Sequence, residues 1–240
     1  MGDLKIGILE AGPVVEPLRT RYGSYPMMME ALLADRGFAF DTYAVLEGVL
    51  PGSIHDADGW LITGSRHGAY DDLPWIAPLE QFLRDAFAAR VPIVGICFGH
   101  QILAQALGGR VEKFAGGWAI GRQRYALKGF DRPLEIIGLH QDQVIEAPKE
   151  AEVTGSAPDC EIAALSYGEQ AWTLQPHPEF NPEFFDELME ARREVLPADL
   201  VADARKTLAG TYDNAIVADK IEAVFKSSHQ DRSTPKAAAE

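Results

Sequence analysis

The chain has 240 residues, and its 22 lysine and arginine residues against 36 aspartate and glutamate residues give a net charge of −14. This charge argues against nucleic acid and anionic membranes as partners and indicates that a partner surface would be basic. Apolar residues make up 47% of the chain, which predicts one globular domain rather than a disordered or fibrous protein. Two cysteines allow no disulfide framework, and the first residues lack the features of a secretory signal, so we expect a cytoplasmic protein.

The first part of the chain alternates between short apolar runs and segments with helical spacing. The runs expected to form buried strands are 4–9, 38–44, 59–63 and 91–96. The segments expected to form helices are 24–36, 75–90 and 101–107. Strands that alternate with helices at this spacing predict a central parallel sheet whose two faces are covered by helices.

The pattern changes after residue 110. Short runs separated by turn residues predict strands of a mixed or antiparallel part at 124–127, 134–138, 143–146, 161–165 and 171–174. Helical spacing returns at 182–194, 197–209 and 213–225. The stretch 227–240 is polar and alanine-rich, so we expect it to be disordered. The expected fold class is therefore α/β, with a mostly parallel sheet, a small antiparallel part and C-terminal helices.

A cysteine lies between an expected strand and the helix that follows it. Gly95, Cys97 and Gly99 form a G-x-C-x-G motif, which has the layout of a nucleophile elbow. The two glycines leave room around a side chain that projects from a tight turn. A helix N-terminus favours a thiolate, and the Phe98 amide would point toward a developing oxyanion. The alternative is a buried structural cysteine, which is how we interpret Cys160.

A histidine and a glutamate follow the last expected strand. Pro176 and Pro178 favour an extended backbone at His177, and residues two apart in an extended chain face the same side. Glu179 would then orient the imidazole of His177, and Cys97 would complete the order of contacts found in a catalytic triad. The alternative is a proline-rich surface turn whose histidine and glutamate are only solvated.

Residues 95–101 (GICFGHQ) and 175–180 (QPHPEF) together resemble the motifs of the class I (triad) glutamine amidotransferases. The resemblance implies a flavodoxin-like α/β fold and hydrolysis of a γ-glutamyl amide through a thioester. It makes Cys97, His177 and Glu179 the catalytic residues. Residues 116–121 (GGWAIG) are similar to the stand-alone, GMP-synthase-like branch of the family, which includes γ-glutamyl peptidases.

The resemblance also implies roles for residues around the triad. The backbone amides of Ser65 and Phe98 would form the oxyanion hole. The residues expected to contact the substrate are Gly64, Gln101, His140, Gln141 and Asp142. Asp142 suits the α-ammonium group of a γ-glutamyl substrate, because a buried charge needs a partner of opposite sign. The family often has glycine where this chain has Gln141.

The domain organisation that we expect has three parts. Residues 1–195 form a class I glutamine amidotransferase-like catalytic domain, 196–226 are a C-terminal helical extension of the same domain, and 227–240 are a disordered tail. A glutaminase of this size would supply a separate ammonia-accepting synthetase, whereas a γ-glutamyl peptidase would act alone. Zinc-type and nucleotide-binding motifs do not occur in the sequence, so we expect neither a metal nor another cofactor.

Two other functions are compatible with the same motifs. One is a binding or regulatory protein that has lost turnover, and the intact Cys97, His177 and Glu179 argue against it. The other is an elbow-cysteine protein of the intracellular-protease and chaperone kind, which the Pro-His-Pro-Glu segment fits poorly. The sequence therefore favours a cysteine hydrolase of γ-glutamyl amides.

Overall fold

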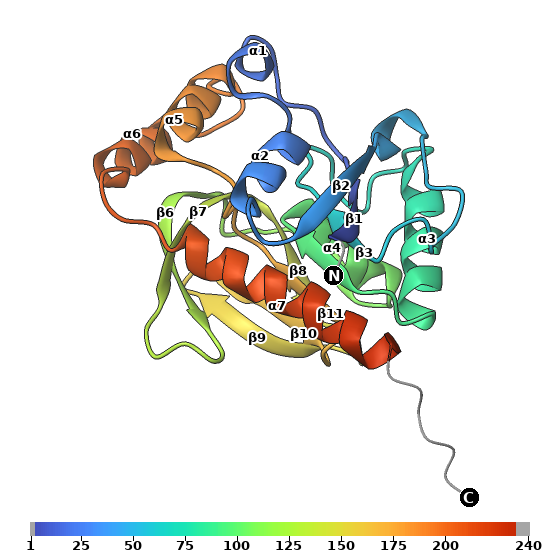
Figure 1. Ribbon diagram of the computed structural model, residues 1–240. Helices are drawn as coiled ribbons and strands as arrows, with labels where there is room; N and C mark the ends of the chain where they lie inside the picture. Colours follow the sequence, from blue (N-terminus) through green and yellow to red (C-terminus); the bar gives the residue numbers. More distant parts are fainter. Residues whose placement is uncertain (1–2, 234–240) are drawn as a thin grey trace, which may run out of the picture.

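A nine-stranded mixed sheet forms the centre of the protein, in the order β2-β1-β3-β4-β11-β10-β9-β6-β7 (Figure 1). The computed structural model describes residues 3–233, with side chains up to Ser227. The strands are β1 (Leu4–Leu9), β2 (Phe38–Tyr43), β3 (Gly59–Ile62), β4 (Ile93–Ile96), β5 (Arg110–Lys113), β6 (Ala119–Leu127), β7 (Leu134–His140), β8 (Asp142–Glu146), β9 (Glu152–Ala157), β10 (Cys160–Tyr167) and β11 (Ala171–Leu174). The helices are α1 (Leu18–Tyr22), α2 (Tyr25–Leu32), α3 (Ile76–Ala88), α4 (Phe98–Ala106), α5 (Pro182–Ala191), α6 (Ala198–Thr207) and α7 (Asn214–Ser233), with a short 3-10 helix at Val45–Glu47.

The sheet has a parallel half and an antiparallel half. Strands β2, β1, β3, β4 and β11 run parallel to their neighbours, as the alternation of strands and helices predicts. Strands β10, β9, β6 and β7 continue the same sheet with antiparallel pairing, and β5 pairs with β8 in a separate two-stranded sheet. The α/β class is confirmed, and the antiparallel part is larger than we expected.

Besides the short 3-10 helix, one helix and two strands were not predicted from the sequence. The helix α1 has five residues, which is too short for a helical period to be visible in the sequence. The strands β5 and β9 are largely exposed, so their residues lack the apolar run or the strict alternation that marks a half-buried strand. Both strands form because neighbouring strands supply their hydrogen-bond partners. Strand β5 pairs with β8, and β9 pairs with β10, the next strand in the chain, and with the more distant β6.

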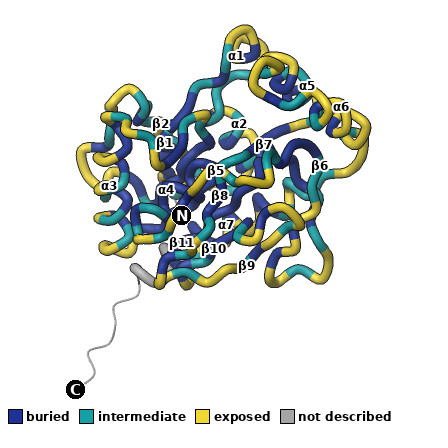
Figure 2. The backbone as a smooth tube through the Cα atoms, turned by 180° about the vertical axis from the view of Figure 1, so that it is seen from behind, coloured by how far each residue is buried: buried dark blue, intermediate teal, exposed yellow. Residues whose placement is uncertain are grey.

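Helices cover both faces of the parallel half of the sheet. On β3, the side chains of Trp60 and Ile62 pack with α3 and α4, while Leu61 packs on the opposite face with α2 and α7. This alternation follows from the two-residue period of a strand, and each such buried side chain contributes roughly 1.5–3 kcal/mol. Figure 2 shows the central strands as buried and the outer turns and loops as exposed.

The helices that were predicted lie at the expected positions in the sequence, but several begin or end at other residues. Ser24 caps α2, as its position before Pro26 predicts. The helix expected at 101–107 instead begins at Phe98, because the elbow residue Cys97 is itself the helix N-cap. The helix expected at 213–225 continues to Ser233, so this part of the expected tail is helical. Residues 234–240 lie outside the described part of the chain.

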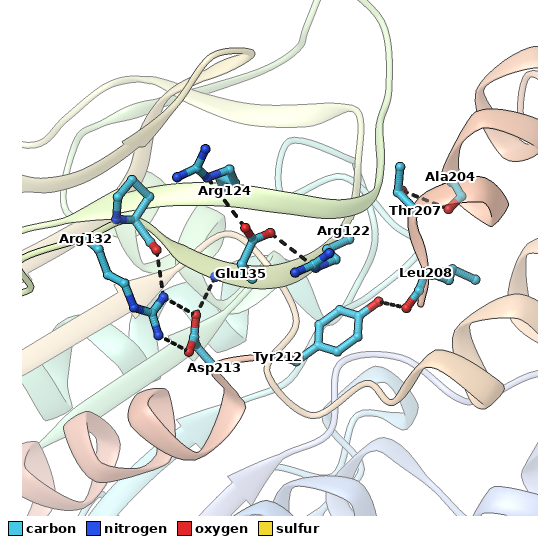
Figure 3. Close-up of polar contacts among 10 residues, drawn as sticks. Arg122, Arg124, Arg132, Glu135, Ala204, Thr207, Leu208, Tyr212 and Asp213 are labelled. Carbon is cyan, nitrogen blue, oxygen red and sulfur yellow. Dashed lines mark hydrogen bonds and ion pairs between the residues drawn. The ribbon is translucent and has the colours of Figure 1, made fainter. Parts of the chain in front are cut away.

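A polar cluster anchors the start of α7 to β7 (Figure 3). The carboxylate of Asp213 accepts two hydrogen bonds from Arg132, at 2.6 and 2.8 Å, and one from the backbone N–H of Glu135 at 2.8 Å. The N–H of Asp213 returns a bond of 2.9 Å to the carbonyl of Glu135. Because α7 packs on β4 and β11, this cluster fixes a helix that supports the strands leading to the candidate site.

Candidate active site

Three neighbouring parallel strands end at the same edge of the sheet, and each is followed by residues that the sequence indicated. Gly64 and Ser65 follow β3, Cys97 follows β4, and Gln175 and His177 follow β11. The carboxyl edge of an open α/β sheet is where such folds bind their ligands. Motifs 80 positions apart in the sequence therefore lie on adjacent strands.

Cys97 occupies a strained turn between β4 and α4. Its φ of 53° and ψ of −102° lie outside the regions favoured by residues with a side chain, at a cost of about 1–3 kcal/mol. A Cβ at Gly95 would lie 2.4 Å from the carbonyl oxygen of Gly99, and a Cβ at Gly99 would lie 2.5 Å from that of Ile62. Both glycines are therefore required for the close approach that holds the elbow against β3.

The imidazole of His177 is held from three sides. Its Nδ1 is 2.7 Å from Oε1 of Glu179, and its backbone N–H donates a 2.8 Å hydrogen bond to the carbonyl of Ile137. The ring stacks on Phe180 with centroids 4.1 Å apart and planes 3° from parallel. Since Nδ1 faces the carboxylate, Nε2 is the nitrogen available for the hydrogen bond between His177 and the thiol of Cys97.

This arrangement favours the charged form of His177. Burial alone lowers the pKa of the imidazole, but the negative charge of Glu179 and the contact with Cys97 outweigh it and raise the pKa. The second carboxylate oxygen of Glu179 is buried without a hydrogen-bond partner among the described residues. The two side chains thus depend on each other, because removing either one leaves a buried charge without its partner.

The loop after β3 lies close to both Cys97 and His177. A Cβ at Gly64 would lie 2.9 Å from Cε1 of His177 and 3.7 Å from Cβ of Cys97. Ser65 lines the cavity that contains Cys97, and its hydroxyl accepts a 3.1 Å bond from the N–H of His67. The N–H of Phe98 stands at the start of α4, where helix amides have no intrahelical acceptor. Of the two amides expected to hold an oxyanion, one is therefore on the loop after β3 and the other is at the first residue of α4, directly after Cys97.

The expected substrate-contacting residues occupy different positions around a cavity of about 230 Å³ beside Cys97. Gln101, Gln141 and Asp142 line it. The Asp142 carboxylate accepts a hydrogen bond from the Tyr70 hydroxyl, and burial raises the pKa of Asp142. Gly64 instead borders a neighbouring cavity that contains His177.

His140 also lines the cavity beside Cys97, and its ring is buried. Burial lowers the pKa of His140 to about 3, with the nearby His177 acting in the same direction. The imidazole of His140 is therefore neutral, and its contact with a substrate stays a prediction.

One further residue of the site was not assigned a role from the sequence. Gln175 is fully buried, and its Nε2 lies 3.6 Å from Sγ of Cys97. Its Oε1 accepts a 3.1 Å bond from Gln101, whose Nε2 also donates to the carbonyl of Asp142 at 2.8 Å. This chain of amides links the thiol to the cavity wall. Gln175, His177 and Glu179 are spaced two residues apart, so in an extended backbone their side chains face the same side. This spacing could have indicated Gln175 from the sequence.

Within 3–233, no helix has the length and apolar character needed to cross a bilayer. The same part of the chain has no group of three or more histidine, cysteine or acidic side chains positioned to hold a metal ion.

Comparison with known proteins places this geometry in a family. Residues 50–193 match the family described as "Glutamine amidotransferase class-I". The chain is 26% identical to gamma-glutamyl peptidase 3 of Arabidopsis thaliana, over 86% of this chain and 90% of that protein. It is 30% identical to a glutamine amidotransferase-like protein of Schizosaccharomyces pombe, over 91% of this chain and 97% of that protein.

Solved structures show the same fold. A crystal structure of a glutamine amidotransferase from Methylobacillus flagellatus superposes with a TM-score of 0.75 at 21% identity, covering 100% of this chain and 99% of that one. A glutamine amidotransferase from Thermotoga maritima gives a TM-score of 0.72 at 19% identity, covering 96% and 100% of the two chains. The chain belongs to the class I glutamine amidotransferase family.

Proposed function

We propose that the protein hydrolyses a γ-glutamyl amide through a thioester on Cys97. The observation that carries this proposal is the placement of a strained elbow cysteine in contact with a histidine whose other nitrogen is 2.7 Å from a buried glutamate. Membership of the family and the similarity to plant γ-glutamyl peptidases support the same reaction class. Release of glutamate together with ammonia or an amine is the chemical outcome.

The reaction proceeds in two balanced halves. His177 takes the proton of Cys97, and the sulfur attacks the γ-carbonyl carbon while the amides of Ser65 and Phe98 hold the oxyanion. His177 then gives its proton to the leaving nitrogen as the carbon–nitrogen bond breaks. Water adds to the thioester, His177 takes a proton from it, and the carbon–sulfur bond breaks to release glutamate. The proton returns to Cys97, and Glu179 keeps Nδ1 oriented throughout.

The charged end of the substrate fits the cavity beside Cys97. Asp142 would bind the α-ammonium group by exchanging its contact with Tyr70 for one with the substrate. Lys113 lines the same cavity and would face the α-carboxylate. Gln101 is held by Asp142 and Gln175, so its amide would shape the wall rather than move with the substrate.

The test uses the two cysteines of the chain as a matched pair. Cys97→Ala should abolish release of glutamate from glutamine and from γ-glutamyl dipeptides, and an electrophilic glutamine analogue should no longer add covalently to the protein. Cys160→Ala is the control, because Cys160 is buried and its pKa is raised to about 12 by burial, which keeps it a thiol. Full hydrolysis by Cys97→Ala, or no hydrolysis of any γ-glutamyl compound by the wild type, would contradict the proposal.

A further inference from the structure

A second cavity adjoins the one beside Cys97 and has a different character. Its volume is about 370 Å³, and its wall includes His177, Tyr25 and apolar side chains such as Val15, Phe180 and Leu188. The two cavities share Ser65, Arg66, Leu139, Arg192 and Val195. They therefore lie on either side of one common wall, with the nucleophile in the first cavity and the histidine in the second.

The positions of Cys97 and His177 define which part of a substrate would enter each cavity. The acyl carbon must meet Sγ of Cys97, so the γ-glutamyl part lies in the first cavity with Asp142 and Lys113. The leaving nitrogen must receive its proton from His177, so the group attached to that nitrogen extends into the second cavity. Ammonia would leave this second cavity unused, whereas an amine of amino-acid size would occupy it.

Two arginines stand at the boundary without acidic partners. Most arginine and lysine side chains of the described residues form ion pairs, but no acidic side chain within 3–227 lies within ion-pair distance of Arg66 or Arg192. The two guanidinium groups are close enough for Arg66 to lower the pKa of Arg192, in addition to the larger effect of burial. Glu194 is the one acidic residue of the second cavity's described lining, and it is exposed.

The local structure fixes Arg192 in this position. Its backbone N–H closes the C-terminal end of α5 by donating to the carbonyls of Leu188 and Met189. Its guanidinium lies over the ring of Trp118, 5.5 Å from the centroid. A helix C-terminus and an aromatic face both stabilise a cation, so the charge is held in place before any ligand binds. In a chain of net charge −14, such a pair of free cations at a cavity indicates an anionic ligand.

We propose that Arg66 and Arg192 bind a carboxylate on the leaving group, so that the enzyme selects γ-glutamyl peptides whose next residue has a free carboxylate. This inference rests on the proposed function and adds the chemical class of the amine. The apolar wall of the second cavity accommodates the side chain of that residue, and the two guanidinium groups donate charge-assisted hydrogen bonds to its carboxylate. Glutamine, whose leaving group is ammonia, gains nothing from these contacts.

The experiment compares two substrates that differ at a single group. γ-Glutamyl-alanine ends in a carboxylate and γ-glutamyl-alaninamide ends in a neutral amide, and the readout is the ratio of their kcat/KM values. For the wild type we expect the carboxylate to be favoured by at least about 10-fold. Arg192→Gln and Arg66→Gln should each reduce the ratio several-fold, and Arg192→Lys should keep part of it. Lys220→Gln, which removes an exposed charge on α7, should leave the ratio unchanged.

The outcomes separate this inference from the proposed function. Equal kcat/KM values for the two dipeptides in the wild type, or a preference that survives both arginine variants, would overturn the leaving-group site while hydrolysis itself stands. Absence of hydrolysis for both dipeptides and for glutamine would overturn the proposed function and this site with it. Arg66 is exposed, so Arg66→Gln should remain folded by circular dichroism and keeps the test valid even if Arg192→Gln is unstable.

Discussion

Replacing Gly64 by alanine should disable the site while leaving the protein folded. The added methyl group would lie 2.9 Å from Cε1 of His177, about 0.6 Å closer than carbon atoms normally approach. The ring has little freedom to retreat, because Glu179 holds Nδ1 at 2.7 Å and Phe180 stacks on its face at 4.1 Å. The loop must therefore shift away from Cys97 or the ring must turn out of line.

The size of the effect follows from this displacement. A misplacement of about 1 Å in a catalytic group costs roughly 100-fold in rate, so we expect Gly64→Ala to lower kcat/KM by about 10- to 100-fold. Gly64 does not have a positive φ, so the substitution introduces no backbone strain. The free energy of unfolding should change by about 1 kcal/mol or less, far less than for Gly95→Ala, whose methyl group would meet a backbone carbonyl oxygen at 2.4 Å.

The assay combines steady-state hydrolysis of a γ-glutamyl dipeptide with urea unfolding. Gly52→Ala is the matched control, because a Cβ at Gly52 would have an ordinary contact of 3.5 Å with the carboxylate of Asp56. It should keep wild-type activity and stability. A Gly64→Ala protein with wild-type kcat/KM would refute the reasoning, since it would show that the imidazole is not confined as the structure indicates.

Three further predictions concern ionisable groups. Glu179→Gln removes the charge that raises the pKa of His177, so kcat/KM should fall by about 100-fold or more. The alkaline limb of the pH profile of kcat/KM should also move to lower pH, and a limb at the wild-type pH would contradict this prediction. Asp213→Ala should cost about 1–3 kcal/mol of unfolding free energy at pH 7. The hydrogen bond from Arg132 lowers the pKa of Asp213, so the loss of unfolding free energy in Asp213→Ala should shrink as the pH falls through the native pKa of Asp213. A loss that does not depend on pH would contradict this prediction. Burial lowers the pKa of His100 to about 4, so below about pH 6.5 the unfolded chain binds a proton that the native protein does not bind. Between pH 8 and pH 5 the free energy of unfolding should therefore fall by about 2 kcal/mol less in His100→Gln than in the wild type. Chemical unfolding at both pH values measures this difference.

The parallel half of the fold and the motifs at its edge could be predicted from the amino-acid sequence. Continuous apolar runs such as 91–96 have few alternatives to a buried strand, and the glycines around Cys97 have a steric meaning that does not depend on distant residues. The antiparallel strands were less visible, because β5 and β9 are largely exposed and are held by hydrogen bonds to neighbouring strands rather than by a buried apolar face of their own. Exposed strands carry little periodic signal of their own.

The assembly of the site depends on how distant segments pack together. The sequence suggested His177, Glu179 and Cys97 from local spacing, but the distance between His177 and Cys97 depends on β4 and β11 being neighbours in the sheet. The convergence of Arg66 and Arg192 had no sequence signal, because one follows β3 and the other ends α5. Local geometry is encoded within a few residues, whereas a cavity depends on side chains from segments that meet only when the sheet and its helices have packed.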